Sequence, residues 1–299
     1  MTAIINWLNT PMFVGEQKMY VIAAYIFAGL IGLVIGSFLN VVIYRVPNGM
    51  SIAMPPSHCP NCDYKLKWYD NIPVLSYIIL GGKCRSCKQK ISFRYTVVEL
   101  LNMLLWILCV FVFVDNKGHG ELIRINEYFN RPGLAYAVIA MITCSVLLCV
   151  AFIDLEHTFI PDRFQVILGV LGVLAIVCNL LGFNDGITWL ERVIGALGSL
   201  LLFLIIYFGG KLAFKKEAMG IGDIKLVTVV GLILGWKNMI VALFIGFLVG
   251  AVVMVIAKRV RNDEAFHEYP FGPFLALGML IALFFGSDII NAYLSLIHI

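Results

Sequence analysis

Residues 19–44 read MYVIAAYIFAGLIGLVIGSFLNVVIY and contain no charged side chain. A helix needs about 20 apolar residues to cross the hydrocarbon core of a bilayer, and this stretch exceeds that length. The whole chain of 299 residues has a similar character, with 61% hydrophobic and only 13% charged residues. An ordinary soluble domain has roughly 25% charged residues. The sequence therefore predicts a membrane protein.

Further uncharged windows of similar length predict more membrane-spanning helices. They cover residues 133–153, 164–183, 193–210, 238–257 and 269–286. Residues 96–114 form another despite Glu99 near one end, and residues 222–236 form a shorter one with Asp223 and Lys225 near its start. We therefore expect an all-α polytopic membrane protein with about eight transmembrane helices.

The positions of Lys and Arg predict the orientation, because cytoplasmic loops are enriched in them. Most of the 22 Lys and Arg residues lie on the cytosolic side if the first helix exits into the cytosol at Arg45. Both termini are then periplasmic, and the polar segment between the first two helices is cytosolic. Since topology accounts for the basic excess behind the net charge of +4, we expect no nucleic-acid partner.

The polar segment 45–95 is rich in Pro and Cys and contains two Cys-x-x-Cys pairs, Cys59/Cys62 and Cys84/Cys87, with 21 residues between them. Four thiolates around one tetrahedral zinc ion would stabilise a segment that is too small to build its own core. Two redox dithiols or two disulfides are the alternative. Because cytosolic thiols are kept reduced, we favour one structural, zinc-ribbon-like site. The other cysteines lie in apolar windows and are interpreted as small hydrophobic residues: Cys109, Cys144, Cys149 and Cys178.

Two acidic residues stand at the same edge of the membrane in this topology, Asp154 at the end of the third span and Asp223 at the start of the sixth. Antiparallel packing of these helices would bring the two carboxyl groups face to face. Such a pair shares a proton, and the ionised member can take a proton from water that attacks a peptide carbonyl. The pair is therefore a candidate aspartic-protease dyad, although intramembrane acids also serve proton relays.

Structural interpretations compete for these acids. Asp162 follows Pro161 at the start of the fourth span, where a negative side chain suits the helix dipole, so it is only a secondary catalytic candidate. Asp223 could be an N-cap after two glycines, or could pair with Lys225. Asp154 ends its helix, where the dipole disfavours a negative charge, so a structural role is harder to assign.

Several motifs follow one another along the chain. The N-terminal ones are GSFLNVVIYRVP at 36–47, the two Cys-x-x-Cys pairs, NIPVLSY at 71–77, and Arg94-Tyr95 with Glu99. The later ones are Asp154 with Ile-Pro-Asp at 160–162, GIGDIK at 220–225 and PFGPFL at 270–275. In this order they resemble the type IV prepilin leader peptidases, integral-membrane aspartic proteases with a Gly-x-Gly-Asp motif. The likeness covers nearly the whole chain.

The resemblance implies removal of the short basic leader from type IV prepilins, and from pseudopilins of type II secretion, at the cytoplasmic face of the bacterial inner membrane. It implies that Asp154 and Asp223 are the catalytic pair. Members of the family with the four cysteines also methylate the new N-terminal amine with S-adenosylmethionine, so we expect both activities. No nucleotide-binding motif indicates where the methyl donor binds. Membrane lipid is the other expected partner.

We therefore expect three domains: a first transmembrane helix with a family motif at 1–44, a cytosolic four-Cys zinc domain at 45–95, and a transmembrane peptidase domain at 96–299. A proton-coupled transporter that uses the same Asp pair is the main alternative. Transporter sites usually lie near the bilayer midplane between inverted repeats, whereas these acids lie at one face. A zinc-ribbon scaffold that only recruits other proteins would leave Asp154 without a role.

Overall fold

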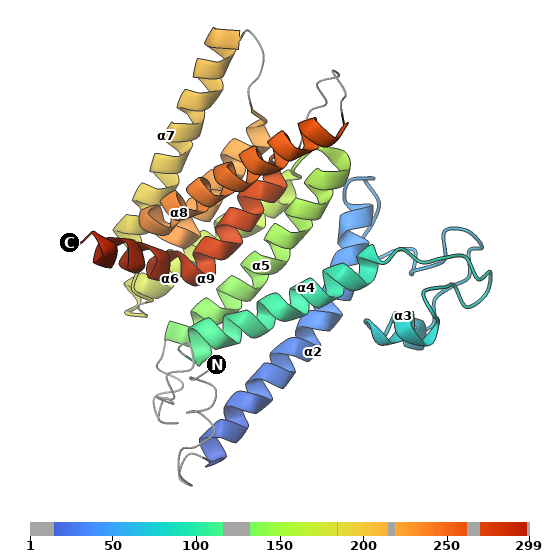
Figure 1. Ribbon diagram of the computed structural model, residues 1–299. Helices are drawn as coiled ribbons and strands as arrows, with labels where there is room; N and C mark the ends of the chain where they lie inside the picture. Colours follow the sequence, from blue (N-terminus) through green and yellow to red (C-terminus); the bar gives the residue numbers. More distant parts are fainter. Residues whose placement is uncertain (1–14, 116–131, 184, 215–218, 262–269, 298–299) are drawn as a thin grey trace. The chain divides into compact units, whose positions relative to one another are not determined.

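The computed structural model describes residues 15–115, 132–183, 185–214, 219–261 and 270–297. In these residues the chain is helical, and β-structure is limited to two isolated bridges. Seven of the described helices are long and apolar enough to cross a membrane. The chain forms two compact units, Met1–Ser145 and Val146–Ile299, so that the boundary falls within helix α5 (Figure 1).

The first unit is built on α2 (Gly15–Arg45) and α4 (Arg94–Cys109), which continues as a π-helical turn η3 (Val110–Val114). The two helices approach closely at Gly36, where an added Cβ would lie 2.8 Å from the Cα of Glu99. Asn102 donates a hydrogen bond of 2.7 Å to the carbonyl of Gly32 and accepts one of 2.8 Å from Ser145. Small residues and satisfied polar groups are the usual means of packing helices in lipid.

A polar insert separates α2 from α4 and contains two short helices, η2 (Trp68–Asn71) and α3 (Leu75–Ile79). Its buried polar centre is Asp70, which accepts hydrogen bonds from Arg85 (2.7 Å), Tyr64 (3.1 Å) and the backbone N–H of Lys67 (3.2 Å). These contacts connect the two halves of a segment that has few buried apolar side chains.

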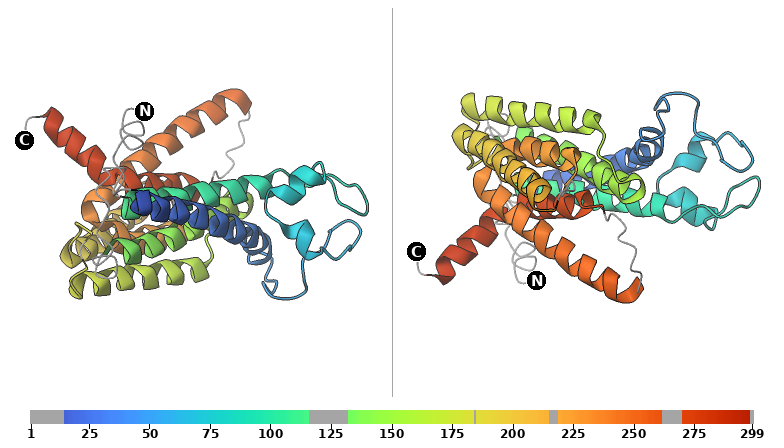
Figure 2. Two further views of the ribbon diagram at one scale, coloured as in Figure 1. Left: turned by 90° about the horizontal axis from the view of Figure 1, so that it is seen from below. Right: turned by 90° about the horizontal axis from the view of Figure 1, so that it is seen from above.

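The second unit contains the C-terminal part of α5 (Pro132–His157) and four further helices. These are α6 (Asp162–Leu180), α7 (Trp189–Phe214), α8 (Ile221–Arg261) and α9 (Gly272–Leu296). Helix α8 packs against α6, α7 and α9 and forms the centre of this unit (Figure 2).

The expected spans at 222–236 and 238–257 are the two halves of α8, which breaks at Gly235 with φ 71° and ψ 168°. This explains why eight expected spans correspond to seven long helices. The left-handed φ favours glycine, and an added Cβ would lie 2.8 Å from Ile187. The other expected spans fall on α2, α4 with η3, α5, α6, α7 and α9; Tyr269, the first residue of the last one, lies outside the described residues.

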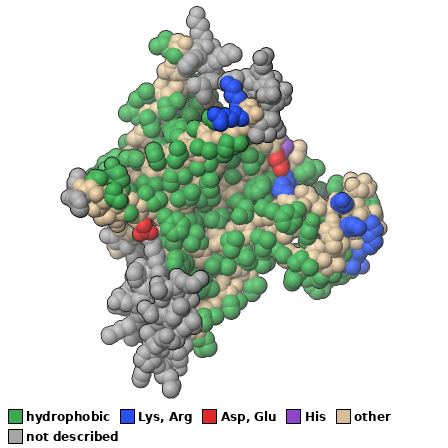
Figure 3. Space-filling model, viewed as in Figure 1, with side chains coloured by type: hydrophobic (Ala, Val, Ile, Leu, Met, Phe, Trp, Pro, Cys, Tyr) green, Lys and Arg blue, Asp and Glu red, His purple; other side chains and the backbone are tan. Residues whose placement is uncertain are grey.

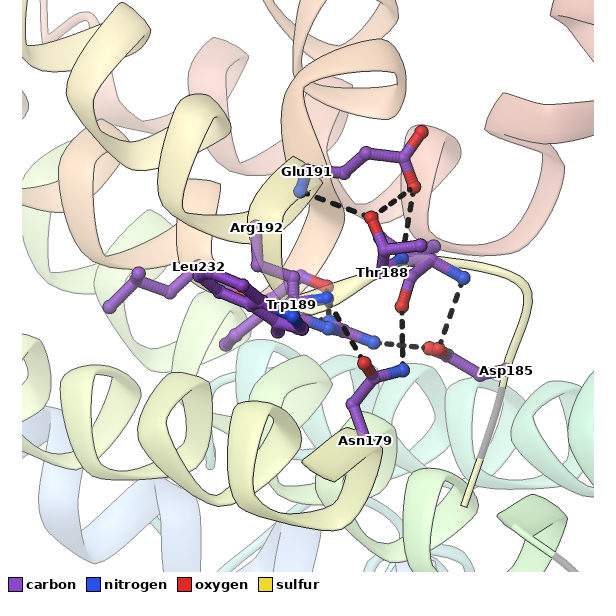
Figure 4. A network of polar contacts seen from close by, with 9 residues as sticks. Asn179, Asp185, Thr188, Trp189, Glu191, Arg192 and Leu232 are labelled. Atoms are coloured by element: carbon purple, nitrogen blue, oxygen red, sulfur yellow. Dashed lines mark hydrogen bonds and ion pairs between the residues drawn. The ribbon is translucent and has the colours of Figure 1, made fainter. Parts of the chain in front are cut away.

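A buried arginine, Arg192, lies at this break (Figure 4). Its guanidinium donates to the carbonyls of Leu232 and Ile233, in the last turn before Gly235, and to the carboxylate of Asp185. A break in a helix frees backbone carbonyls, which need partners in a water-free environment. Nothing in the sequence had pointed to this role.

Candidate functional site

The four cysteines of the insert lie together. Their Sγ atoms are all within 4.8 Å of one another, with 3.8 Å between Cys59 and Cys87 and 4.0 Å between Cys62 and Cys84. Four sulfurs at about 2.3 Å from a tetrahedral zinc ion would be separated by about 3.8 Å. None of the four is in a disulfide. The donor set and its spacing are therefore compatible with one zinc ion.

The two Cys-x-x-Cys turns have the same local geometry. The N–H groups of Asp63 and Lys88 donate to the carbonyls of Cys59 and Cys84, respectively. Asp63 and Lys88 both have a positive φ, 53° and 58°. Each turn is closed by an antiparallel bridge, His58 to Lys65 and Lys83 to Lys90. Two matching turns that face each other form one four-sulfur site.

Hydrogen bonds around Cys87 favour its ionised form. The backbone N–H of Gln89 and the side-chain amide of Asn61 donate to its sulfur, and they lower the pKa of the Cys87 thiol to about 6. In the same cluster the pKa of the Cys59 thiol is raised to about 11, with burial and hydrogen bonds from Cys84 and Cys62 among the causes that raise it. The four thiols therefore differ in acidity, and each must be ionised to bind a metal ion.

In the second unit, Asp154 lies in the last turn of α5 and is buried. Its Oδ2 accepts a hydrogen bond of 2.9 Å from the backbone N–H of Gly272, the first residue of α9. The dipole of α5 disfavours a negative charge here, as expected, but the N-terminus of α9 favours one. This contact supplies the stabilising partner that could not be seen in the local sequence.

Asp223 lies in the first turn of α8, two residues after its start at Ile221, and is not the N-cap. Its side chain is half-buried. The preceding residue, Gly222, packs on Ile160, and its carbonyl accepts a hydrogen bond of 3.2 Å from the buried side chain of Gln165. Thus α5, α6, α8 and α9 meet around the two aspartates.

Asp162 has a different environment. It is the first residue of α6, its side chain is exposed, and it accepts a hydrogen bond of 2.8 Å from Lys225. Lys225 therefore pairs with Asp162 rather than with Asp223, which corrects one alternative drawn from the sequence. An exposed ion pair at the start of a helix is sufficient to explain Asp162.

Two features of this site were missed in the sequence. Gln165 could have been noticed as a polar residue in the apolar window 164–183. The hydrogen bond between Gly272 and Asp154 could not have been predicted from the sequence, because it joins residues that are 118 positions apart.

Motif residues of the first unit also come together. The buried carboxylate of Glu99 accepts a hydrogen bond of 2.8 Å from the backbone N–H of Val74, in the NIPVLSY motif. Asn40, from the first-helix motif, donates one of 3.0 Å to the carbonyl of Tyr95. The first bond attaches the insert to α4, and the second joins α2 to α4.

Comparison with known proteins gives consistent results over both units. The model of the bacterial peptidase A24 N-terminal domain matches residues 30–113, and that of the type IV leader peptidase family matches residues 141–255. A prepilin leader peptidase/N-methyltransferase of Pseudomonas aeruginosa is 33% identical, over 89% of this chain and 91% of the relative. A protein of the same name from Aeromonas salmonicida is 34% identical, over 90% and 93%. No solved structure matches the chain.

Proposed function

The chain belongs to the type IV leader peptidase family, and we propose that it cleaves the leader from type IV prepilins and pseudopilins and methylates the new N-terminal amine with S-adenosylmethionine. The observation that supports cleavage most directly is geometric: Asp154 in the last turn of α5 and Asp223 in the first turn of α8 lie at the same end of the second unit. There Gly222 contacts Ile160, and Gly272 donates a hydrogen bond to Asp154. Methylation is supported by the name shared by relatives that align over nine-tenths of the chain.

In the proposed cleavage, one aspartate keeps its proton and the other is ionised, because two neighbouring carboxylates cannot both ionise cheaply. The ionised carboxylate takes a proton from a water molecule, whose oxygen attacks the scissile carbonyl carbon. The protonated carboxyl group gives its proton to the carbonyl oxygen. As the tetrahedral intermediate collapses, the C–N bond breaks and the leaving amine receives the proton taken from water.

The neighbours of the dyad have positioning roles in this proposal. The N–H of Gly272 holds one oxygen of Asp154, and Gln165 holds the carbonyl of Gly222 beside Asp223. Both contacts limit the movement of the two aspartates. General acid–base catalysis requires such limited movement, because the catalytic groups must keep their position relative to the substrate. We assign the methyl transfer to the chain as a whole and no step of it to a residue.

The family and the seven apolar helices make this a multi-pass protein of the inner membrane. We propose that both termini are periplasmic and that the insert is cytosolic, as the positions of Lys and Arg indicate. The scissile bond of a substrate with a basic cytosolic leader and an apolar membrane helix then lies at the depth of the dyad. We propose that the chain has three domains, at residues 1–44, 45–95 and 96–299. In the second domain, a structural zinc ion would be held by Cys59, Cys62, Cys84 and Cys87. The transporter alternative has no support among the relatives.

The test is cleavage of a purified prepilin by the full-length protein, compared with Asp154→Asn and Asp223→Asn. Each substitution keeps the shape of the side chain and removes the acid, so each should lower kcat by about 10²- to 10⁴-fold. Asp162→Asn is the matched control, because it removes an exposed carboxylate near the same edge, and should stay near the wild-type rate. A folded Asp154 or Asp223 variant with full activity would overturn the dyad.

Methylation is tested on the cleavage product of the wild-type protein. Mass spectrometry of the product should show one added methyl group only when S-adenosylmethionine is present.

A further inference from the structure

The short helix α3 has an apolar face with no protein partner among the described residues. Leu75, Ile78 and Ile79 are 55%, 66% and 76% exposed. Their spacing of three and four residues puts them on one face of the helix. Trp68, on the neighbouring η2, is 79% exposed. A cluster of large apolar side chains in a polar insert usually marks an interaction surface.

The position of this face is set by contacts to a membrane-spanning helix. The N–H of Val74, the residue before α3, donates a hydrogen bond of 2.8 Å to Glu99. Glu99 is five residues after Arg94, where α4 begins, so it lies about 7.5 Å along the helix from that end at 1.5 Å per residue. The ring of Tyr77 also contacts that of Phe93, with 5.9 Å between the centroids.

These contacts attach the start of α3 to the first turns of α4, and Figure 1 shows α3 in the part of the chain next to that end of α4. Residues Arg94–Val114 form one of the candidate membrane spans. Because Val74 is bonded to a residue in the second turn of this span, the start of α3 lies near the end of α4 that would meet the membrane surface.

The charge of the insert agrees with this position. Within residues 46–93, between α2 and α4, the Lys and Arg side chains are all exposed: Lys65, Lys67, Lys83, Arg85, Lys88 and Lys90. Only Asp63 and Asp70 are acidic in residues 46–95. Figure 3 shows Lys and Arg on the outer side of the insert, the lobe at the right, and hydrophobic side chains along its lower edge. Basic side chains close to a membrane surface are attracted to anionic headgroups.

We propose that α3 is an interfacial helix, which buries Leu75, Ile78 and Ile79 among lipid acyl chains while the surrounding lysines contact anionic headgroups. A single turn and a half of helix is too small to form a stable protein–protein interface, which typically buries about 800 Å² on each partner. A lipid surface requires no matching shape and is already present at this depth. Exposed apolar side chains on one face of a helix, within a small domain whose charged residues are mostly basic, are features of segments that lie on a membrane surface.

The experiment places the photo-cross-linker p-benzoylphenylalanine at Ile79 in the full-length protein, reconstituted in nanodiscs containing phosphatidylglycerol. The matched control carries it at Met54, which is 70% exposed and lies in the loop that Arg45 holds through the carbonyls of Ser51 and Pro55. We expect a severalfold higher yield of lipid adducts at Ile79 than at Met54. Replacing phosphatidylglycerol with phosphatidylcholine should lower the yield at Ile79.

Equal lipid adducts at the two sites would overturn the proposal, and so would adducts of Ile79 mainly to a second copy of the chain or to added prepilin. Hydrogen exchange of the unmodified protein gives an independent measurement. Amides of residues 75–79 should exchange more slowly in phosphatidylglycerol nanodiscs than in phosphatidylcholine nanodiscs, and equal exchange in both would contradict the role of the anionic headgroups.

Discussion

The backbone N–H of Gly272 donates a hydrogen bond of 2.9 Å to Oδ2 of Asp154. An added Cβ on Gly272 would lie 2.7 Å from the same oxygen. The first residue of α9 thus holds one carboxyl group of the proposed dyad, and only glycine fits at this position without displacing that carboxyl group. The PFGPFL motif has a direct structural connection to the acid at the end of α5.

Gly272→Ala should therefore displace the carboxyl group of Asp154. A displacement of about 1 Å at a catalytic group can cost about 10²-fold in rate. We expect kcat for prepilin cleavage to fall by about 10- to 100-fold with little change in KM, measured under steady-state conditions. Gly198→Ala is the control, because an added Cβ there meets nothing within 4 Å. Equal rates for the two alanine variants would show that the contact does not position Asp154.

Gln165→Leu should have a smaller effect on the same step. It removes the hydrogen bond of 3.2 Å to the carbonyl of Gly222, and one such bond contributes about 1 kcal/mol. If all of that energy positions Asp223, kcat should fall by up to about fivefold. The neighbouring Val166 is exposed, so Val166→Leu serves as the control. A fall in the unfolding temperature of Gln165→Leu without any loss of kcat would assign Gln165 a structural role only.

Removal of zinc should unfold the insert. Structural zinc contributes about 10–16 kcal/mol in small domains, and the insert has few buried apolar side chains to replace that energy. We expect one zinc ion per chain by elemental analysis, and loss of both zinc and protease resistance in Cys84→Ser. Cys178→Ser, which changes a cysteine of α6 outside the cluster, should retain both. A chain purified without zinc, yet resistant to protease in the insert, would contradict the structural role.

Asp70→Asn should destabilise the insert in a way that depends on pH. Burial raises the pKa of Asp70, but hydrogen bonds from Arg85, Lys67 and Tyr64 lower it by more, so its pKa lies below the ordinary value. A lowered pKa in the folded state gives stability that is fully present above the unfolded pKa of about 3.9 and is lost as pH falls through the folded value.

We expect the wild-type insert to be about 1–3 kcal/mol more stable than Asp70→Asn at pH 7, measured by urea-induced zinc release. The difference between the two proteins should stay constant from about pH 8 to pH 5, because Asp70 remains ionised over that range. A difference that already shrinks between pH 7 and pH 5 would mean that the pKa of Asp70 is raised rather than lowered.

Arg192→Met should destabilise the second unit. Methionine has no donor for the carbonyls of Leu232 and Ile233 or for Asp185, and removing one member of a buried pair typically costs about 3–5 kcal/mol. We expect a clear fall in the thermal unfolding midpoint in detergent. The control is Lys237→Met, which breaks the partly exposed pair with Glu191 and should cost about 0–1 kcal/mol. Similar midpoints for the two variants would show that the break at Gly235 does not depend on Arg192.

Much of the site could be predicted because its markers are local in the chain. The spacing of Cys59, Cys62, Cys84 and Cys87 indicated one four-sulfur cluster, and the structure brings the four sulfurs together. The positions of Asp154 and Asp223 at helix ends indicated a catalytic pair, which stays a prediction, and the structure places the two residues in the last turn of α5 and the first turn of α8. The partner of Lys225 was the part that local reasoning could not decide, because the acid that it pairs with, Asp162, lies 63 positions earlier in the chain.

The sequence by itself determined that this chain is a helical membrane protein with a four-cysteine insert, since the length of an apolar run and the spacing of ligands are local properties. The tertiary structure decided that two expected spans share one helix broken at Gly235, that Arg192 is buried at the break, and that Gly272 holds Asp154. Each of these depends on which helix faces meet across the bundle. That choice is made by packing between residues far apart in the chain, which no local pattern records.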